Sequence, residues 1–230
     1  MLPVKLRLLL TAAVLLLVPS AHAAGPSVDA RAYLVEDGRT GEVLLAGNPA
    51  RRVPIASLTK LMTVLVTLEK TQLSDLVTVS PEAAAVGESS VNLRAGEQLT
   101  VRDLIEACLI QSANDAAWAL ADHVGRGSES RFVAMMNRRA RELGLSESHF
   151  VRPDGLDAAG HVSSARDVTM LARLLMRKAV VRQIVAMRDA TIAGGNAVRK
   201  RRGGIGSSYH CSVGIRQAAV TISQSGQFGR

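Results

Sequence analysis

The chain has 230 residues and a formal net charge of +8, with 47% hydrophobic but only 3% aromatic residues. That length allows one or two domains with a substantial aliphatic core, and so few aromatic side chains argue against a protein that stacks nucleic-acid bases. The charge gives no nucleic-acid footprint either, because six of the basic residues follow Asp189, the last acidic residue, and the rest of the chain is nearly neutral.

The N-terminus has the three-part layout of a secretory signal. Lys5 and Arg7 precede an apolar run of eleven residues at 8–18, and Ala21-His22-Ala23 offers small residues to a signal peptidase. A bilayer span needs about 20 apolar residues. We therefore predict a signal peptide over residues 1–23, with an uncleaved N-terminal anchor as the alternative. Both interpretations imply an exported protein of the periplasm or cell-wall space.

Hydrophobic periodicity predicts alternating short strands and helices over residues 31–187. Residues 31–36 and 42–46 flank turn residues and indicate a β-hairpin. Apolar residues at helical spacing predict a helix that begins near Ser57. Residues 71–99 are expected to be irregular, with strand-like runs at 77–79 and 91–93. Further helices are predicted at 101–110, 114–124 and 132–143, and another follows a Pro/Gly/Asp-rich loop at 149–163.

The two cysteines, Cys108 and Cys211, are too few for a disulfide framework. Cys108 lies in an apolar helical run, so we expect a small buried hydrophobic side chain. The sequence has no CxxC motif or Cys/His cluster, and no metal or organic cofactor is predicted.

Ser57-Leu58-Thr59-Lys60 forms an S-x-x-K motif. Positions i and i+3 of a helix share a face, so the Lys60 amine can reach the Ser57 hydroxyl. A serine becomes a good nucleophile when a base takes its proton, and a lysine can be that base if burial lowers its pKa. Taken alone, the motif is better explained by a helix-capping serine and a solvated lysine.

Ser112-Ala113-Asn114 lies where one apolar helix ends and the next begins. A hydroxyl and an amide two residues apart at such a junction can point into one cleft, where the hydroxyl can relay a proton and the amide can hold a carbonyl. Taken alone, this motif too is better explained by local turn chemistry.

In this order and spacing, the two motifs resemble those of the penicillin-binding proteins and serine β-lactamases. The surrounding sequence is similar to the low-molecular-weight D-alanyl-D-alanine carboxypeptidases. The likeness covers roughly residues 30–187 and is carried by residues 54–63, 111–116, 132–145, 150–156 and 164–167, and by the turn at 37–44.

This resemblance implies an α+β fold of the β-lactamase/transpeptidase type. An antiparallel sheet flanked by helices would be joined to a mostly helical subdomain that carries Ser112 and Asn114. The resemblance also implies that Ser57 attacks the carbonyl between two D-alanines and that Lys60 activates it. Ser112 would pass the proton to the leaving D-alanine, and Asn114 would orient the peptide.

One expected element of the family is missing. A Lys/His-Thr/Ser-Gly tripeptide should follow Ser112 by roughly a hundred residues on a sheet strand, but Tyr209-His210-Cys211-Ser212 stands there instead. Residues 188–230 are rich in basic residues, glycine and serine, and we expect no further strands in them. We interpret this stretch as a divergent tail of an incomplete catalytic domain over residues 24–187. The favoured hypothesis is a shifted reading frame. The alternatives are a truncated homologue with a disordered basic tail, and a tail that binds nucleic acid or a surface through residues 199–202.

The leading hypothesis is a serine D-alanyl-D-alanine carboxypeptidase. A serine β-lactamase is a second hypothesis, although no general-base glutamate loop is evident. A third is an inactive relic that binds the cell wall. The resemblance names peptidoglycan stem peptides and β-lactams as partners and is compatible with peripheral membrane association. The sequence predicts no oligomeric state.

Overall fold

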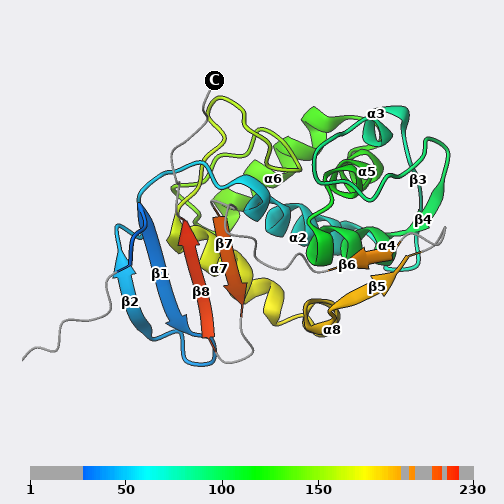
Figure 1. Cartoon of the computed structure of the whole chain (residues 1–230). Coiled ribbons are helices and arrows are strands. Elements are labelled where there is room, and N and C mark those ends of the chain that lie inside the picture. Colours follow the sequence, from blue (N-terminus) through cyan, green and yellow to red (C-terminus); the bar gives the residue numbers. More distant parts are fainter. Residues whose placement is uncertain (1–27, 193–196, 200–208, 214–216, 223–230) are drawn as a thin grey trace, which may run out of the picture.

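The computed structural model describes residues 28–192, 197–199, 209–213 and 217–222. The predicted signal peptide at 1–23 lies outside these residues. The described part is an α+β fold in which one sheet is packed against a group of helices (Figure 1). This is the predicted fold class.

The principal sheet has four antiparallel strands in the order β2-β1-β8-β7. The predicted hairpin is confirmed, with β1 at Ala32–Asp37 and β2 at Val43–Gly47. Buried and partly exposed residues alternate along β1, as expected for a strand with one face on the core. Asp37 closes the turn by accepting hydrogen bonds from the backbone N–H groups of Arg39 and Thr40.

The expectation that residues 188–230 contain no strands is wrong. The chain forms β5 at Asp189–Thr191, β6 at Ala197–Arg199, β7 at Tyr209–Val213 and β8 at Gln217–Ile222. β8 pairs along the whole length of β1, so the edge of β1 that faces away from β2 is hydrogen-bonded. β5 and β6 have three residues each and are too short for a periodic pattern to reveal them.

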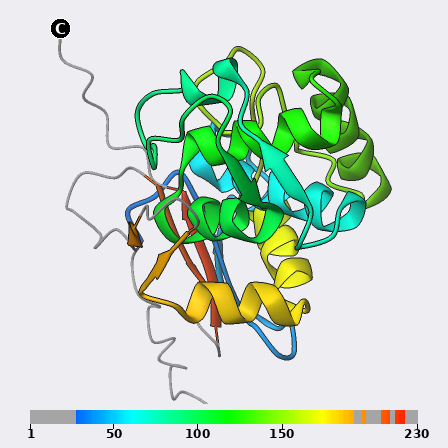
Figure 2. The same cartoon turned by 90° about the vertical axis from the view of Figure 1, so that its right-hand side faces the viewer.

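The helical part is built around α2, Lys60–Lys70, which follows a 3₁₀ turn, η1, at Ala56–Thr59. Figures 1 and 2 show α2 in the middle of the molecule, and it contacts α5, α6 and α7. In turn α7, Ala165–Met176, contacts β1 and β8. Because α2 is covered on several sides, the side chain of its first residue is withdrawn from water.

Three of the remaining helical segments lie close to their predicted positions: α4 (Val101–Glu106) with the π-helical η2 (Ala107–Gln111), α5 (Asn114–Gly125) and α6 (Glu129–Glu142). Two short helices were not predicted: α3 (Pro81–Ala84), in the stretch expected to be irregular, and α8 (Ala179–Ala186). The capping box of Thr100 and Asp103 is present at α4, and Ser164 caps α7 by accepting from the Asp167 N–H.

The expected strand at residues 91–93 is not present. The small second sheet pairs β3, Leu76–Thr78, with β4, Gln98–Thr100. The backbone N–H groups of Val91 and Leu93 instead donate to the buried carboxylate of Asp115. A side-chain acceptor from α5 therefore takes the hydrogen bonds that a neighbouring strand would have taken.

Within the described ranges, no helix has the length and apolar character needed to cross a membrane.

Candidate active site

Ser57 lies in η1, Ala56–Thr59, which we call the Ser57 turn. This turn joins the sheet side of the molecule to α2. Ser57 is exposed, whereas Thr59 is fully buried and Lys60 is 2% exposed. Ala56, directly before Ser57, has a φ of 44°, in the left-handed region that a residue with a Cβ rarely adopts. Such backbone strain persists only where surrounding contacts hold it.

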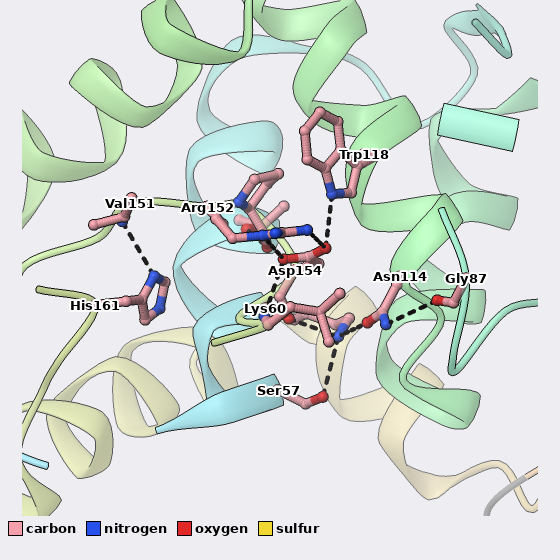
Figure 3. Close-up of polar contacts among 12 residues, drawn as sticks. Ser57, Lys60, Gly87, Asn114, Trp118, Val151, Arg152, Asp154 and His161 are labelled. Carbon is pink, nitrogen blue, oxygen red and sulfur yellow. Dashed lines mark hydrogen bonds and ion pairs between the residues drawn. The ribbon is translucent and has the colours of Figure 1, made fainter. Parts of the chain in front are cut away.

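The Lys60 amine makes three hydrogen bonds. Its Nζ lies 2.7 Å from Asn114 Oδ1, 2.8 Å from the Asp154 carbonyl oxygen and 3.2 Å from Ser57 Oγ (Figure 3). These acceptors come from α5, from the loop at 149–163 and from the Ser57 turn. An ammonium has three protons to donate, so all three are used here. The structure thus brings together Ser57, Lys60 and Asn114, three of the four residues selected from the sequence.

Burial lowers the pKa of Lys60 from 10.5 to about 8, although the carboxylates of Asp154 and Asp115 act in the opposite direction. With this lowered pKa, a part of the Lys60 amine is unprotonated near neutral pH and can accept a proton. Cys108 is itself buried, as predicted, and burial raises the pKa of its thiol to about 12. The thiol is therefore uncharged beside Lys60.

Asn114 is held from both sides at the start of α5. Its backbone N–H donates to the Ser89 carbonyl at 2.6 Å, and its Nδ2 donates to the Gly87 carbonyl at 3.3 Å. The next residue, Asp115, is fully buried and accepts from Ser90 Oγ and from two backbone N–H groups of the same loop. Asp115 thus ties the loop at 87–93 to α5 and fixes the environment of the Asn114 amide.

Ser112 follows the π-helical turn η2 and adopts a left-handed conformation, with φ 63° and ψ 38°. Among the residues that the structure describes, its hydroxyl has no hydrogen-bond partner. The proton-relay role of Ser112 remains a prediction that the geometry of the other three residues does not test.

Asp154 fixes the carbonyl that holds Lys60. Its carboxylate is fully buried and accepts from Arg152 Nε and Nη2, both at 3.0 Å, from Trp118 Nε1 at 2.7 Å and from the Leu156 N–H at 3.1 Å. Burial alone would raise the pKa of Asp154, but the hydrogen bonds from Arg152, Trp118 and Leu156 bring it below its usual value. The Arg152 guanidinium also lies 5.7 Å from the centre of the Trp118 ring.

The loop at 149–163 reaches the Ser57 turn at two further points. His161 Nε2 lies 2.7 Å from Thr59 Oγ1, and the Val151 N–H donates to His161 Nδ1. Gly155 has a φ of 86° and packs so closely that a Cβ there would lie 2.0 Å from the Ala56 carbonyl oxygen. The loop and the turn are thus one packed unit.

A cavity of about 340 Å³ opens beside this unit. It is lined by Pro54, Ile55, Ala56, Gly155, Leu156, Asp157, Ala158, Ala159 and His161. Within the described ranges, no group of three or more His, Cys, Asp or Glu side chains could hold a metal ion.

A family model described as D-alanyl-D-alanine carboxypeptidase, Peptidase_S11, matches residues 19–202. The chain belongs to this family. The match extends beyond residue 187, where the likeness was expected to end, into the segment that contains β5 and β6.

Individual Peptidase_S11 members agree with this assignment. The chain is 41% identical over 177 residues to D-alanyl-D-alanine carboxypeptidase DacC of Escherichia coli and 39% identical over 154 residues to DacF of Bacillus subtilis. These matches cover 70% and 65% of this chain, but only 44% and 39% of the relatives. The chain therefore spans about two fifths of the length of these relatives.

Solved structures support the fold independently. The crystal structure of penicillin binding protein 6B from Escherichia coli has a TM-score of 0.77 and 29% identity, and the match covers 90% of this chain and 75% of that one. A D-alanyl-D-alanine carboxypeptidase from Mycobacterium tuberculosis has a TM-score of 0.77 and 25% identity, with coverage of 90% and 86%. The transpeptidase-like fold expected from the sequence is thereby confirmed.

The sequence did not identify the supporting residues Asp115, Asp154 and His161. They lie outside the two motifs, and Asp154 and His161 are in a loop without periodicity. A usable signal was present in the Pro/Gly/Asp-rich composition of 149–163, since loops of this kind often carry functional groups.

Proposed function

We propose that the chain is a serine D-alanyl-D-alanine carboxypeptidase that forms an acyl-enzyme on Ser57. The observation that carries this proposal is the Lys60 amine, which is buried and hydrogen-bonded to Ser57, Asn114 and the Asp154 carbonyl. Because the family relatives are much longer than this chain, its activity and substrate are inferred from this site.

The three distances around Lys60 assign the base. A neutral amine has two protons and one lone pair. The two shorter bonds, to Asn114 and to the Asp154 carbonyl, can keep the two protons, and the lone pair then faces Ser57 Oγ at 3.2 Å. Lys60 can therefore take the Ser57 proton as the hydroxyl attacks.

The reaction then proceeds in two steps. Ser57 Oγ attacks the carbonyl between the two D-alanines, and the backbone N–H of Ser57 donates to the developing oxyanion, which is worth roughly two to three orders of magnitude in rate. The C–N bond breaks, and the proton held by Lys60 reaches the departing amine through Ser112. Asn114 orients the peptide. Water then hydrolyses the ester and regenerates Ser57.

Release of D-alanine from an N-acylated peptide ending in D-alanyl-D-alanine tests this proposal. We expect release by the full chain, loss of release in Ser57→Ala, and no change in Ser146→Ala, which alters an exposed serine outside the site. Penicillin distinguishes the related activities, because a carboxypeptidase retains it as a long-lived ester whereas a β-lactamase turns it over. A folded wild-type chain that neither releases D-alanine nor retains penicillin would contradict the proposal.

A second candidate is a homologue that binds cell-wall peptides without cleaving them. The specific observation in its favour is the absence of the expected Lys-Thr-Gly tripeptide, which would supply a second oxyanion donor and a cation for the substrate carboxylate. Binding of the same peptide by wild type and by Ser57→Ala, with no D-alanine released by either, would favour this candidate.

We also propose that the protein is exported and acts on peptidoglycan stem peptides in the periplasm or cell-wall space. The basic, apolar and small-residue segments of 1–23 support this. The N-terminal sequence of protein purified from the native cell envelope tests it. A mature chain that begins at Ala24 is expected, and an intact Met1 in the cytosolic fraction would contradict export.

A further inference from the structure

We propose that His161 is a positioning residue that fixes the Ser57 turn by donating a hydrogen bond from Nε2 to Thr59 Oγ1. This inference deepens the proposed function and rests on it, since it concerns the same nucleophile. His161 is far from Ser57 in sequence and belongs to neither motif, yet it contacts the residue directly before Lys60.

The hydrogen bonds of the imidazole determine its tautomer. The Val151 backbone N–H donates to Nδ1 at 3.1 Å, so Nδ1 must be the unprotonated nitrogen (Figure 3). A neutral imidazole then has its proton on Nε2, which lies 2.7 Å from Thr59 Oγ1. His161 is 4% exposed, and its ring packs edge-on against the Phe150 ring, with 5.9 Å between the ring centroids. This packing holds the imidazole in its orientation.

The Ser57 turn needs such external support. The 3₁₀ turn η1 has no side-chain cap at its N-terminus, and Ala56, its first residue, has a left-handed φ of 44°. Thr59 is fully buried within the turn, between Ser57 and Lys60. A hydrogen bond to the Thr59 hydroxyl therefore holds a short, strained segment in place. This segment sets the position of Ser57 Oγ relative to Lys60 Nζ.

Burial keeps the His161 ring neutral in the working range. Burial lowers the pKa of His161 to about 4, with smaller and opposing effects from Asp154, Arg152, His149 and Asp157. Thr59, which packs against the ring from η1, is uncharged. A protonated ring could not accept from the Val151 N–H, so neutrality preserves both hydrogen bonds.

Two substitutions separate the Thr59 contact from the Val151 contact. In His161→Gln the side-chain amide nitrogen can occupy the place of Nε2 and keep the donation to Thr59. In His161→Asn the shorter side chain can keep only the contact near Nδ1. The readout is the rate constant for acylation by a fluorescent penicillin, with the melting temperature measured in parallel.

We expect His161→Asn to lower the acylation rate about 10- to 100-fold, since small displacements of reacting groups cost rates of this order. His161→Gln should remain within about threefold of wild type. Thr59→Val should resemble His161→Asn, and the double variant should be no slower than either single variant, because both remove one interaction. A purely structural role would instead lower rate and stability together in both His161 variants.

Acylation by His161→Asn at the wild-type rate, or an equal loss in His161→Gln, would overturn the inference. A folded wild-type chain that takes no label contradicts the proposed function instead. The inference is then decided on the wild-type chain by long-range ¹H–¹⁵N NMR of the His161 ring. A proton on Nε2 supports it, and a proton on Nδ1 overturns it.

Discussion

Replacing Gly155 by alanine tests how tightly the loop at 149–163 is built onto the Ser57 turn. A Cβ at this position would lie 2.0 Å from the Ala56 carbonyl oxygen, 2.6 Å from the Ala56 carbonyl carbon and 2.7 Å from Thr59 Oγ1. Two of these atoms are backbone, so the overlap can be relieved only by moving the turn or the loop. The φ of 86° adds a conformational cost for any residue with a Cβ.

The two costs can be separated with a matched control. Gly127 also has a positive φ, 74°, but no atom lies within 4 Å of a Cβ built there. Gly127→Ala should therefore lower the free energy of unfolding by about 1 to 2 kcal/mol through φ alone. Gly155→Ala should lower it by about 2 to 5 kcal/mol, because overpacking adds about 1 to 3 kcal/mol.

Thermal unfolding and penicillin acylation measure the outcome together. With a shift of about 2 to 4 °C for each kcal/mol in a domain of this size, the overpacking of about 1 to 3 kcal/mol should make Gly155→Ala melt about 2 to 12 °C below Gly127→Ala. Its acylation rate should also fall, since the displaced atoms flank Ser57, while Gly127→Ala should label at the wild-type rate. Equal melting temperatures and equal labelling rates for the two variants would refute the packing argument.

Three further predictions concern the groups around Lys60. The acylation rate should rise with pH with a midpoint near 8 and then level off, because the amine becomes neutral as the pH passes its lowered pKa. A midpoint near 10.5 would contradict burial as the cause. Asp115→Asn should lower the free energy of unfolding, measured in urea, by about 1.5 to 3 kcal/mol, since it weakens charge-assisted hydrogen bonds to the 87–93 loop. Asp157→Asn, which changes an exposed carboxylate, is its control. Equal losses of stability in the two variants would argue against a stabilising role for the Asp115 hydrogen bonds. Trp118→Phe removes one donor to the buried Asp154 carboxylate and should cost about 1 to 3 kcal/mol by the same measurement; an unchanged unfolding midpoint would show that this bond contributes nothing.

The contact of Ser57 with Lys60 was predictable from the sequence, because positions i and i+3 of a helix share a face. The meeting of Lys60 with Asn114, at 2.7 Å, depended on the family likeness, since no local pattern relates residues so far apart in the chain. Burial of Lys60 accompanies the apolar helix that begins at this residue, whereas the S-x-x-K motif taken alone was better explained by a solvated lysine.

The supporting contacts could not be predicted in the same way. Asp154 contributes its backbone carbonyl to Lys60, and a backbone acceptor leaves no trace in residue type. Asp115 takes the hydrogen bonds of residues 91–93, so a strand-like pattern there became a loop. β8 gains its stability by pairing with β1 at the other end of the chain, which local propensity does not encode.

The most direct test of the account is the residue to which penicillin becomes attached. Wild-type protein is incubated with a labelled penicillin at pH 8, digested and analysed by mass spectrometry, beside Lys60→Met and Ser57→Ala. The account predicts an adduct on the peptide that contains Ser57, far slower labelling in Lys60→Met and none in Ser57→Ala. An adduct on any other residue, or undiminished labelling of Lys60→Met, would contradict the claim that Lys60 activates Ser57.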